Sequence, residues 1–427
     1  MKSVGMYQWM CDLFPINRSL SGAGNRQTLG YLKAIEPKLM INEFPSGQKV
    51  FDWVTPSEWN VSEAFIETLD GNRIVDLEEN NLHLVGYSVN VDKVFRKEEL
   101  IKHIHYLPDQ PTAIPYVTSY YVADWGFCMS YKQFQNLGSG PFRVKINSTF
   151  KSGNSGGSLT YGEVFLPGKS SQEVIFSTYI CHPSMANNEL SGPVIAIALA
   201  RELQALENHY SYRFLFLPET IGAIAYISKN LLRMKQNVIA GWVLTCLGDS
   251  GDFSYVSSRY SNTYADKVTR YLLDRELPKH NIYSWLSRGS DERQYCAPGV
   301  DLPFCSLTRS KYGEYREYHT SLDNLNFVNP ESLQQSLELL VKLTRVLESN
   351  RTPKSSFKCE PQMGKRGVYS TLSTSSSYSN DARQLLDVLS YSDGSNSLTE
   401  IAEICRLDTD TTAQHVARLE NLGLISL

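Results

Sequence analysis

The chain has 427 residues, enough for two or three domains with a sizeable buried core. Its 42% hydrophobic and 20% charged residues are ordinary for a soluble globular protein. The formal net charge of -4 provides no bulk attraction for nucleic acid or for an anionic membrane. Composition and charge therefore argue against a strongly basic nucleic-acid-binding protein.

The eight cysteines are scattered and form no Cys-x-x-Cys pair, which argues against a zinc knuckle and favours reduced thiols. The first ten residues lack the uninterrupted apolar core of a signal peptide. No apolar run approaches membrane-spanning length. We therefore expect a cytoplasmic protein that does not bind membranes.

The sequence changes character near residue 50. Residues 1–50 have a helical pattern at first and are then turn-rich around 14–24. Between 51 and 129, aromatic and β-branched residues alternate with polar ones, and Asp70-Gly-Asn is typical of a hairpin turn. We expect residues 51–129 to form a small β-rich inserted domain.

From about residue 160 the pattern alternates between strands and helices. The expected strands are 173–180, 212–217, 238–246 and 301–307. The expected helices are 190–206, 222–233, 263–276 and 331–348. This alternation predicts an α/β fold, a mostly parallel sheet between helices, formed by residues 1–50 and 130–350.

The C-terminal part has a separate pattern. Residues 351–380 are rich in Ser, Lys and Pro and are predicted to form a connector. Residues 381–427 contain three segments of helical spacing before Leu-Gly-Leu-Ile, which predicts a winged helix-turn-helix. Three arginines stand against eight acidic residues there, a net charge of -5, so nucleic acid is not the expected partner. We expect this domain to bind a protein partner or a second copy of the chain.

Polar residues follow the expected strands. His182 comes after the first, Glu219 after the second, Cys246 and Asp249 at or after the end of the third, and His319 beyond the fourth. Ligands of open α/β sheets bind outside the carboxyl ends of the strands, so these side chains are expected on one rim. Imidazole, carboxylate and thiolate groups are the ligands that zinc prefers.

Each of these residues also has a purely structural interpretation. His182 could be a hydrogen-bonded loop residue, and Glu219 could be a carboxylate favoured at a helix N-terminus. Cys246 could belong to the core, and Asp249 could form a turn. The residue types alone leave these alternatives open.

Three further residues are candidates for the surroundings of the site. Asp291 and Glu292 either orient a ligand histidine or cap a helix. Arg18 lies in the Gly/Ser-rich segment 14–24, which could line the substrate mouth. Both segments are therefore expected to contribute to substrate binding or to positioning.

An ordered series of motifs resembles the di-zinc aminopeptidase family. The motifs are His182, Asn188-Glu-Leu-Ser-Gly192, Glu219-Thr-Ile-Gly222, Leu244-Thr-Cys-Leu-Gly248, Gly289-Ser-Asp-Glu-Arg-Gln-Tyr295 and Tyr318-His-Thr-Ser-Leu-Asp323. The resemblance covers about residues 160–350. It implies that His182 and His319 are zinc ligands, that Glu219 is the general base, and that Asp323 supports the final histidine.

Other segments resemble a bacterial aminopeptidase-like family, often labelled polysaccharide-biosynthesis protein with an aminopeptidase-like domain. These segments are Phe51-Asp-Trp-Val-Thr-Pro-Ser-Glu-Trp59, Ile114-Pro-Tyr-Val-Thr-Ser-Tyr-Tyr121, Cys181–Pro193, Pro218–Gly222 and Glu360-Pro-Gln-Met-Gly-Lys-Arg-Gly-Val-Tyr369. The resemblance covers nearly the whole chain. It implies a β-rich insertion and a C-terminal winged helix, and it implies little about the substrate.

Four positions depart from the di-zinc pattern. Asn188 stands in place of the bridging Asp, and Thr220 in place of the second Glu. Cys246 occupies a ligand Asp position, and Ser184 replaces the Asp that follows the first histidine. A neutral amide cannot offset the charge of two zinc ions as a carboxylate does. We therefore expect one zinc ion, held by His182 and His319 with Asn188, Cys246 or Asp249.

The expected function is that of a zinc-dependent, aminopeptidase-like hydrolase. Glu219 would take a proton from the attacking water, and the substrate would be an amide in a small peptide or in an amino-acid- or sugar-derived metabolite. The alternative is a non-catalytic binding protein that keeps the fold and has lost the second metal site.

Overall fold

The computed structural model describes residues 2–368 and 380–427, which form two compact units. The first comprises Met1–Lys267 and Leu277–Leu340, and the second comprises Val268–Glu276 and Val341–Leu427. In the part of the chain that the structure describes, no helix is long and apolar enough to cross a membrane.

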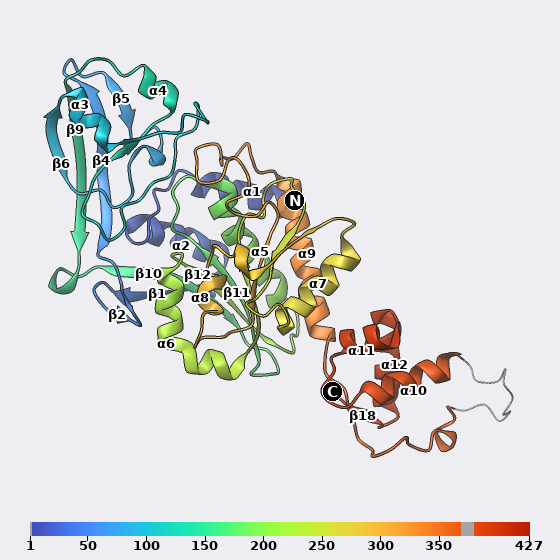
Figure 1. Ribbon diagram of the computed structural model, residues 1–427. Helices are drawn as coiled ribbons and strands as arrows, with labels where there is room; N and C mark the ends of the chain where they lie inside the picture. Colours follow the sequence, from blue (N-terminus) through green and yellow to red (C-terminus); the bar gives the residue numbers. More distant parts are fainter. Residues whose placement is uncertain (1, 369–379) are drawn as a thin grey trace. The chain divides into compact units, whose positions relative to one another are not determined.

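The first unit is built on an eight-stranded mixed sheet (Figure 1). Its order is β1 (Met40–Pro45), β10 (Ser158–Leu166), β12 (Ser211–Leu217), β11 (Glu173–Tyr179), β13 (Val238–Leu244), β16 (Phe304–Thr308), β14 (Ser254–Val256) and β15 (Asn281–Tyr283). The four central strands, β12, β11, β13 and β16, are parallel to one another. Strand β10 pairs antiparallel with β12 on one side, and β14 pairs antiparallel with β16 on the other. Strands β11 and β12 are buried along their whole length, as expected for strands covered on both faces.

Helices flank this sheet, as the alternating pattern predicts (Figure 1). In the first unit these are α1 (Lys2–Leu13), α2 (Ala23–Ile35), α5 (Ser191–Gln204), α6 (Ile221–Asn237), α8 (Glu292–Tyr295) and the first part of α9 (Pro330–Ser349). Helix α7 (Tyr264–Glu276) begins in the first unit and belongs mostly to the second. The expected strands and helices of this region are all present within a few residues of their predicted ends. Pro330 is the first residue of α9, where its missing N–H costs nothing.

A second, four-stranded sheet lies beside the large one in the same unit (Figure 1). Its order is β5 (Arg73–Asp76), β4 (Glu58–Thr68), β9 (Phe142–Lys151) and β6 (Val91–Phe95). Short elements accompany it: β2 (Lys49–Val50), β3 (Trp53–Val54), α3 (Lys97–Leu100), β7 (Ile104–His105), β8 (Phe127–Cys128) and α4 (Tyr131–Gln135). Asp70-Gly-Asn joins β4 to β5 as a hairpin, and β9 lies beyond residue 129.

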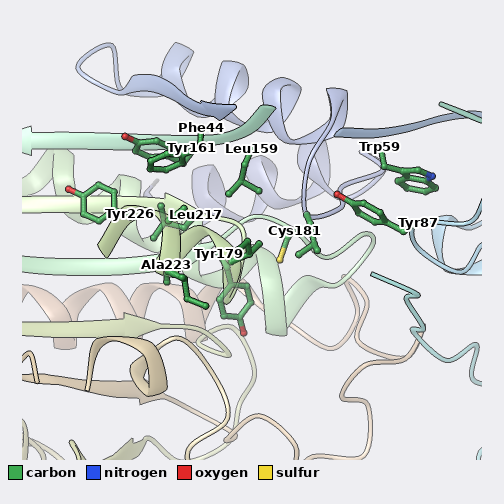
Figure 2. Close-up of a cluster of buried hydrophobic side chains, with 14 of the residues drawn as sticks. Phe44, Trp59, Tyr87, Leu159, Tyr161, Tyr179, Cys181, Leu217, Ala223 and Tyr226 are labelled. Carbon is green, nitrogen blue, oxygen red and sulfur yellow. The ribbon is translucent and has the colours of Figure 1, made fainter. Parts of the chain in front are cut away.

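The two sheets share one hydrophobic core. Its buried residues come from both sheets, for example Ile66 and Val144 of the small sheet and Ile175 and Val243 of the large one. Figure 2 shows the aromatic part, in which Phe44 stacks on Tyr161 and Trp59 on Tyr87. Burial of this continuous apolar surface holds the insertion against the main sheet.

Besides most of α7 and the end of α9, the described part of the second unit contains three short helices and a small β-ribbon. These elements are β17 (Lys354–Ser355), α10 (Asn380–Tyr391), α11 (Leu398–Cys405), α12 (Thr409–Asn421) and β18 (Ile425–Ser426), and β17 pairs with β18. Ser397 caps α11 through a reciprocal pair with Glu400, whereas Asp408, one residue before Thr409, caps α12. Residues 369–379 of the expected connector lie outside the described residues.

Candidate functional site

The candidate site lies beyond the carboxyl ends of the central parallel strands. His182 follows β11, Glu219 follows β12, Cys246 follows β13 and His319 follows β16. The φ angles of Cys246 and His319 are 52° and 55°, and that of Thr220, next to Glu219, is 64°. Non-glycine residues in this left-handed region are strained, and such strain clusters at functional sites.

His182 is oriented by a buried carboxylate. Its Nδ1 donates to Oε2 of Glu189 at 2.8 Å, and the Glu189 carboxylate lies 3.6 Å from Nε of Arg18. All three side chains are buried. Burial lowers the pKa of His182, but the hydrogen bond and charge of Glu189 outweigh it, so the pKa is raised overall. Because Nδ1 is occupied, Nε2 is the nitrogen that faces the site.

Glu219 lies opposite His182, with 3.6 Å between its Oε2 and Nε2 of the histidine. Ser290 donates from Oγ to the other carboxylate oxygen at 3.0 Å. Burial raises the pKa of Glu219, and the charges of His182 and Arg293 offset part of this rise. The side chain keeps 18% exposure, so water and a substrate can reach it.

His319 completes the centre of the site. Its ring centroid lies 5.2 Å from that of His182, and its ring stacks on Tyr318. Its Nε2 atom is buried without a hydrogen-bond partner. Burial, together with the charge of His182, lowers the pKa of His319 to about 2, so the imidazole is neutral and can act as a ligand.

The small-sheet region supplies a wall of the site. Tyr116 contacts both histidines, with its ring centroid 5.1 Å from that of His182 and 5.2 Å from that of His319. Its backbone N–H donates to the carbonyl of His319 at 2.9 Å, and Pro115 forms a bridge with Thr320. The insertion is therefore part of the site.

Asn188 and Cys246 lie together beside Tyr179, whose ring centroid is 5.3 Å from that of His182. Oδ1 of Asn188 accepts a hydrogen bond from the Tyr179 hydroxyl at 3.1 Å and lies 3.9 Å from Sγ of Cys246. Burial raises the pKa of Cys246 well above its ordinary value, which keeps the thiol protonated. The Cys246 thiol donates to the same amide oxygen, so both lone pairs of Asn188 Oδ1 accept hydrogen bonds. An amide oxygen needs no deprotonation to bind a metal, so Asn188 is the better ligand of the two.

The carboxylate of Asp249 is used in hydrogen bonds to neighbouring loops. It accepts hydrogen bonds from Nδ2 of Asn187 at 2.8 Å, from the N–H of Gly251 at 2.6 Å and from Oγ of Ser310 at 2.7 Å. These bonds join three loops at the rim. The geometry therefore supports the turn-forming interpretation of Asp249 over the metal-ligand one.

The other predicted acidic residues position the site. Asp291 accepts from the N–H of Thr220 at 2.7 Å and so supports the turn that carries Glu219. Asp323 accepts from the N–H groups of Asn187 and Asn188 at 2.6 and 2.9 Å. Burial raises the pKa of Asp323 to about 6, and these hydrogen bonds limit the rise.

Glu292 forms a separate buried network. It accepts hydrogen bonds from the N–H of Gly289 and from the hydroxyls of Tyr312 and Ser306, at 2.7 to 2.8 Å. The contacts of Glu292 thus anchor the loop that carries Ser290. They do not orient a histidine.

The sequence did not indicate that Glu189 and Tyr116 belong to the site. It also did not indicate that Arg18 lies against Glu189 and the carbonyl of His182. Glu189 stands next to Asn188 in the printed motif, but its contact with His182 depends on the turn Ala186–Leu190. Cys181, His182 and Glu189 hold their ligand atoms within 4.8 Å of one another. The positive charge of the Arg18 guanidinium beside Glu189 disfavours a metal ion at this cluster. Burial raises the pKa of the Cys181 thiol well above its ordinary value.

Comparison with known proteins identifies the family. Residues 7–350 match the family described as "Domain of unknown function (DUF4910)". The chain is also 41% identical over 398 residues, 93% of its own length and 90% of the relative's, to a Clostridium acetobutylicum protein. That protein is named "Putative polysaccharide biosynthesis protein with aminopeptidase-like domain". The chain belongs to this aminopeptidase-like family.

Solved structures agree with this assignment. A crystal structure of a "putative peptidase" from Clostridium acetobutylicum is 38% identical, with a TM-score of 0.88 over 100% of this chain and 96% of the other. The zinc aminopeptidase BSAP of Bacillus subtilis matches 81% of this chain and 94% of its own at 12% identity, with a TM-score of 0.57. The second similarity shows the fold alone, which is the aminopeptidase-like fold that the motifs predict.

The C-terminal prediction is confirmed in the same way. Residues 351–427 match the family described as "winged helix-turn-helix". This aminopeptidase-like protein therefore carries a second domain of a different class.

Proposed function

We propose that this protein is a metal-dependent, aminopeptidase-like hydrolase that cleaves an amide bond with a single zinc ion. The observation that carries the proposal is the pair His182 and His319. Their ring centroids lie 5.2 Å apart, Nδ1 of His182 is held by Glu189, and Nε2 of His319 has no partner. A carboxylate behind one ligand histidine is the usual support of a zinc-bound imidazole.

The donor set fits one ion better than two. We assign Nε2 of His182 and Nε2 of His319 as ligand atoms, with Oδ1 of Asn188 as the third. To bind the ion, Asn188 Oδ1 gives up its long hydrogen bond from the Cys246 thiol and keeps the one from Tyr179. A second ion would need carboxylates at positions 188 and 220, where the chain has Asn and Thr. Among the described residues, Asp249 is already occupied by its hydrogen bonds, so it supplies no replacement.

Glu219 is the general base in this proposal. A zinc ion at the two histidines would supply Lewis-acid chemistry, which lowers the pKa of water and polarises a carbonyl. Glu219 takes the proton of the attacking water and delivers it to the leaving nitrogen. Burial raises the pKa of this carboxyl toward the working pH, which suits a group that must accept and then release a proton.

The proposed substrate is an amide of a small peptide or of an amino-acid- or sugar-derived metabolite. The support for the sugar-derived class is the name of the Clostridium acetobutylicum relative, which mentions polysaccharide biosynthesis. Tyr116 and Tyr318 lie against His319, so a substrate bound there would meet aromatic rings.

The test is the zinc content of protein purified without added metal. We expect about one zinc per chain by elemental analysis. The double variant His182→Gln/His319→Gln should lose it, whereas His103→Gln, a histidine stacked on Trp125 in the insertion, should keep it. Hydrolysis of a panel of aminoacyl p-nitroanilides, with zinc and with a chelator, tests the reaction. Absence of both zinc and zinc-dependent hydrolysis would overturn the proposal.

The alternative function, a binding protein without catalysis, rests on Asn188. Its amide oxygen already accepts a hydrogen bond from Tyr179, and it brings no negative charge to the ion. Retention of about one zinc per chain, with no hydrolysis of any amide tested, would favour this alternative.

A further inference from the structure

Arg293 is an exposed cation next to the candidate general base. Its Nη2 donates to Oγ1 of Thr220 at 2.7 Å, and Thr220 directly follows Glu219. Within the described residues its guanidinium has no carboxylate at ion-pair distance. A guanidinium has five N–H donors, so most of its hydrogen-bonding capacity faces the solvent beside the site.

One side-chain hydrogen bond and the local backbone place Arg293 beside Glu219. Thr220 holds the guanidinium, and the N–H of Thr220 donates in turn to Asp291, two residues before Arg293. The same segment places Ser290 against Glu219. These hydrogen bonds join the segment that carries Arg293 to the segment that carries Glu219. A group bound by Arg293 would have a defined place relative to Glu219.

The charges around Arg293 select the kind of anion. Glu219 and Asp291 both lie within reach of its charge, which offsets part of the rise that burial causes in their pKa values. Two acidic side chains therefore lie near any anion that Arg293 binds, and their charge disfavours a dianion more than a monoanion.

We propose that Arg293 binds a carboxylate of the substrate at the rim of the site and so selects amides with a carboxylate close to the scissile bond. A planar guanidinium matches a carboxylate in a two-point geometry, and such charge-assisted bonds are among the stronger polar contacts. The inference rests on the proposed function, because it assigns a substrate class to the same site. Arg293 is a specificity-determining residue in this proposal.

The test is a binding measurement on metal-free, full-length protein. Isothermal titration calorimetry compares L-leucyl-L-alanine with L-leucyl-L-alanine amide, which lacks the carboxylate. The wild type should bind the carboxylate form about 10-fold more tightly. Arg293→Gln should abolish this preference. Arg288→Gln is the matched control, because Arg288 is exposed in the same loop and its guanidinium bonds to the carbonyl of Trp285 and lies over the Trp285 ring.

Each outcome decides the inference. Equal affinity of the wild type for the two probes, no binding of either, or a preference that survives in Arg293→Gln would overturn it. Tighter binding of inorganic phosphate than of the carboxylate probe would also overturn it. Zinc content and zinc-dependent hydrolysis are measured separately. The proposed function can therefore hold when the assignment of Arg293 fails, and the assignment of Arg293 can hold when the proposed function fails.

Discussion

His182 and Glu189 are joined by a buried hydrogen bond of 2.8 Å from Nδ1 to Oε2, which leaves Nε2 facing Glu219. We predict that Glu189→Gln lowers the affinity for zinc about 10- to 100-fold, because it removes the charge that holds the imidazole. Competition with a chelator measures this effect. The matched control is Glu173→Gln, a buried carboxylate paired with Arg213 at the opposite end of β11. An equal loss of zinc affinity in both variants would show a general structural effect.

Asn188→Asp should strengthen the metal site without creating a second one. A carboxylate offers charge that the amide lacks, so we expect zinc affinity to rise about 10-fold. The zinc content should stay near one per chain, because Thr220 still offers no carboxylate. Elemental analysis and chelator competition test both statements, with Asn208→Asp at the far end of α5 as control. A ratio near two would contradict the single-site assignment.

Glu219→Gln should abolish hydrolysis while zinc stays bound. The amide cannot accept a proton, and loss of a general base costs about 10²- to 10⁴-fold in rate. Ser290→Ala removes only the hydroxyl that donates to Glu219, so it should cost less. The measurement is kcat on the best aminoacyl p-nitroanilide, alongside the zinc content. Full activity in Glu219→Gln would remove Glu219 from the mechanism.

Gly192→Ala should destabilise the first unit. A Cβ at this position would lie 2.2 Å from Oγ1 of Thr178 and 2.4 Å from the carbonyl oxygen of Leu244, so α5 would have to move off the sheet. We expect a loss of about 2–4 kcal/mol in the free energy of unfolding, measured in urea. Gly30→Ala, with open space around it in α2, should be neutral or stabilising by up to about 1 kcal/mol. Similar losses in the two variants would refute the steric argument.

Glu58 should contribute stability that depends on pH. It accepts hydrogen bonds from Arg26, Asn60 and the N–H of Ser158, and its pKa is lowered to about 2, first by the Arg26 hydrogen bond. The folded state thus keeps the carboxylate ionised where the unfolded state binds a proton. The contribution is complete above about pH 4.5 and is lost as the pH falls toward 2.

The test compares Glu58→Gln with the wild type at two pH values. Because Arg26 is partly exposed, we expect the variant to be less stable by about 1–2 kcal/mol at pH 6.5. That difference should shrink at pH 3.5. A difference that grows toward low pH would show that Glu58 is not ionised in the folded protein.

The secondary structure of the main domain could be predicted from the sequence because its signals are local. Strands β11 and β12 are continuous apolar runs, and α9 begins at Pro330. The places of His182, Glu219 and His319 followed from the same pattern, because parallel strands end at one edge of a sheet. Strands β14 and β15 were not predicted, since each has only three residues.

The sequence by itself therefore determined the fold class, the separate winged-helix domain and the loss of carboxylates at positions 188 and 220. Only the tertiary structure decided which ring nitrogen of His182 faces the site, that Asp249 is engaged elsewhere, and that Tyr116 of the insertion contacts both histidines. The physical reason is that a buried polar group must form hydrogen bonds, and the fold often supplies its partners from residues far away in the sequence. Arg18 binds the carbonyl of His182 across 164 residues of sequence, a contact that local patterns cannot encode.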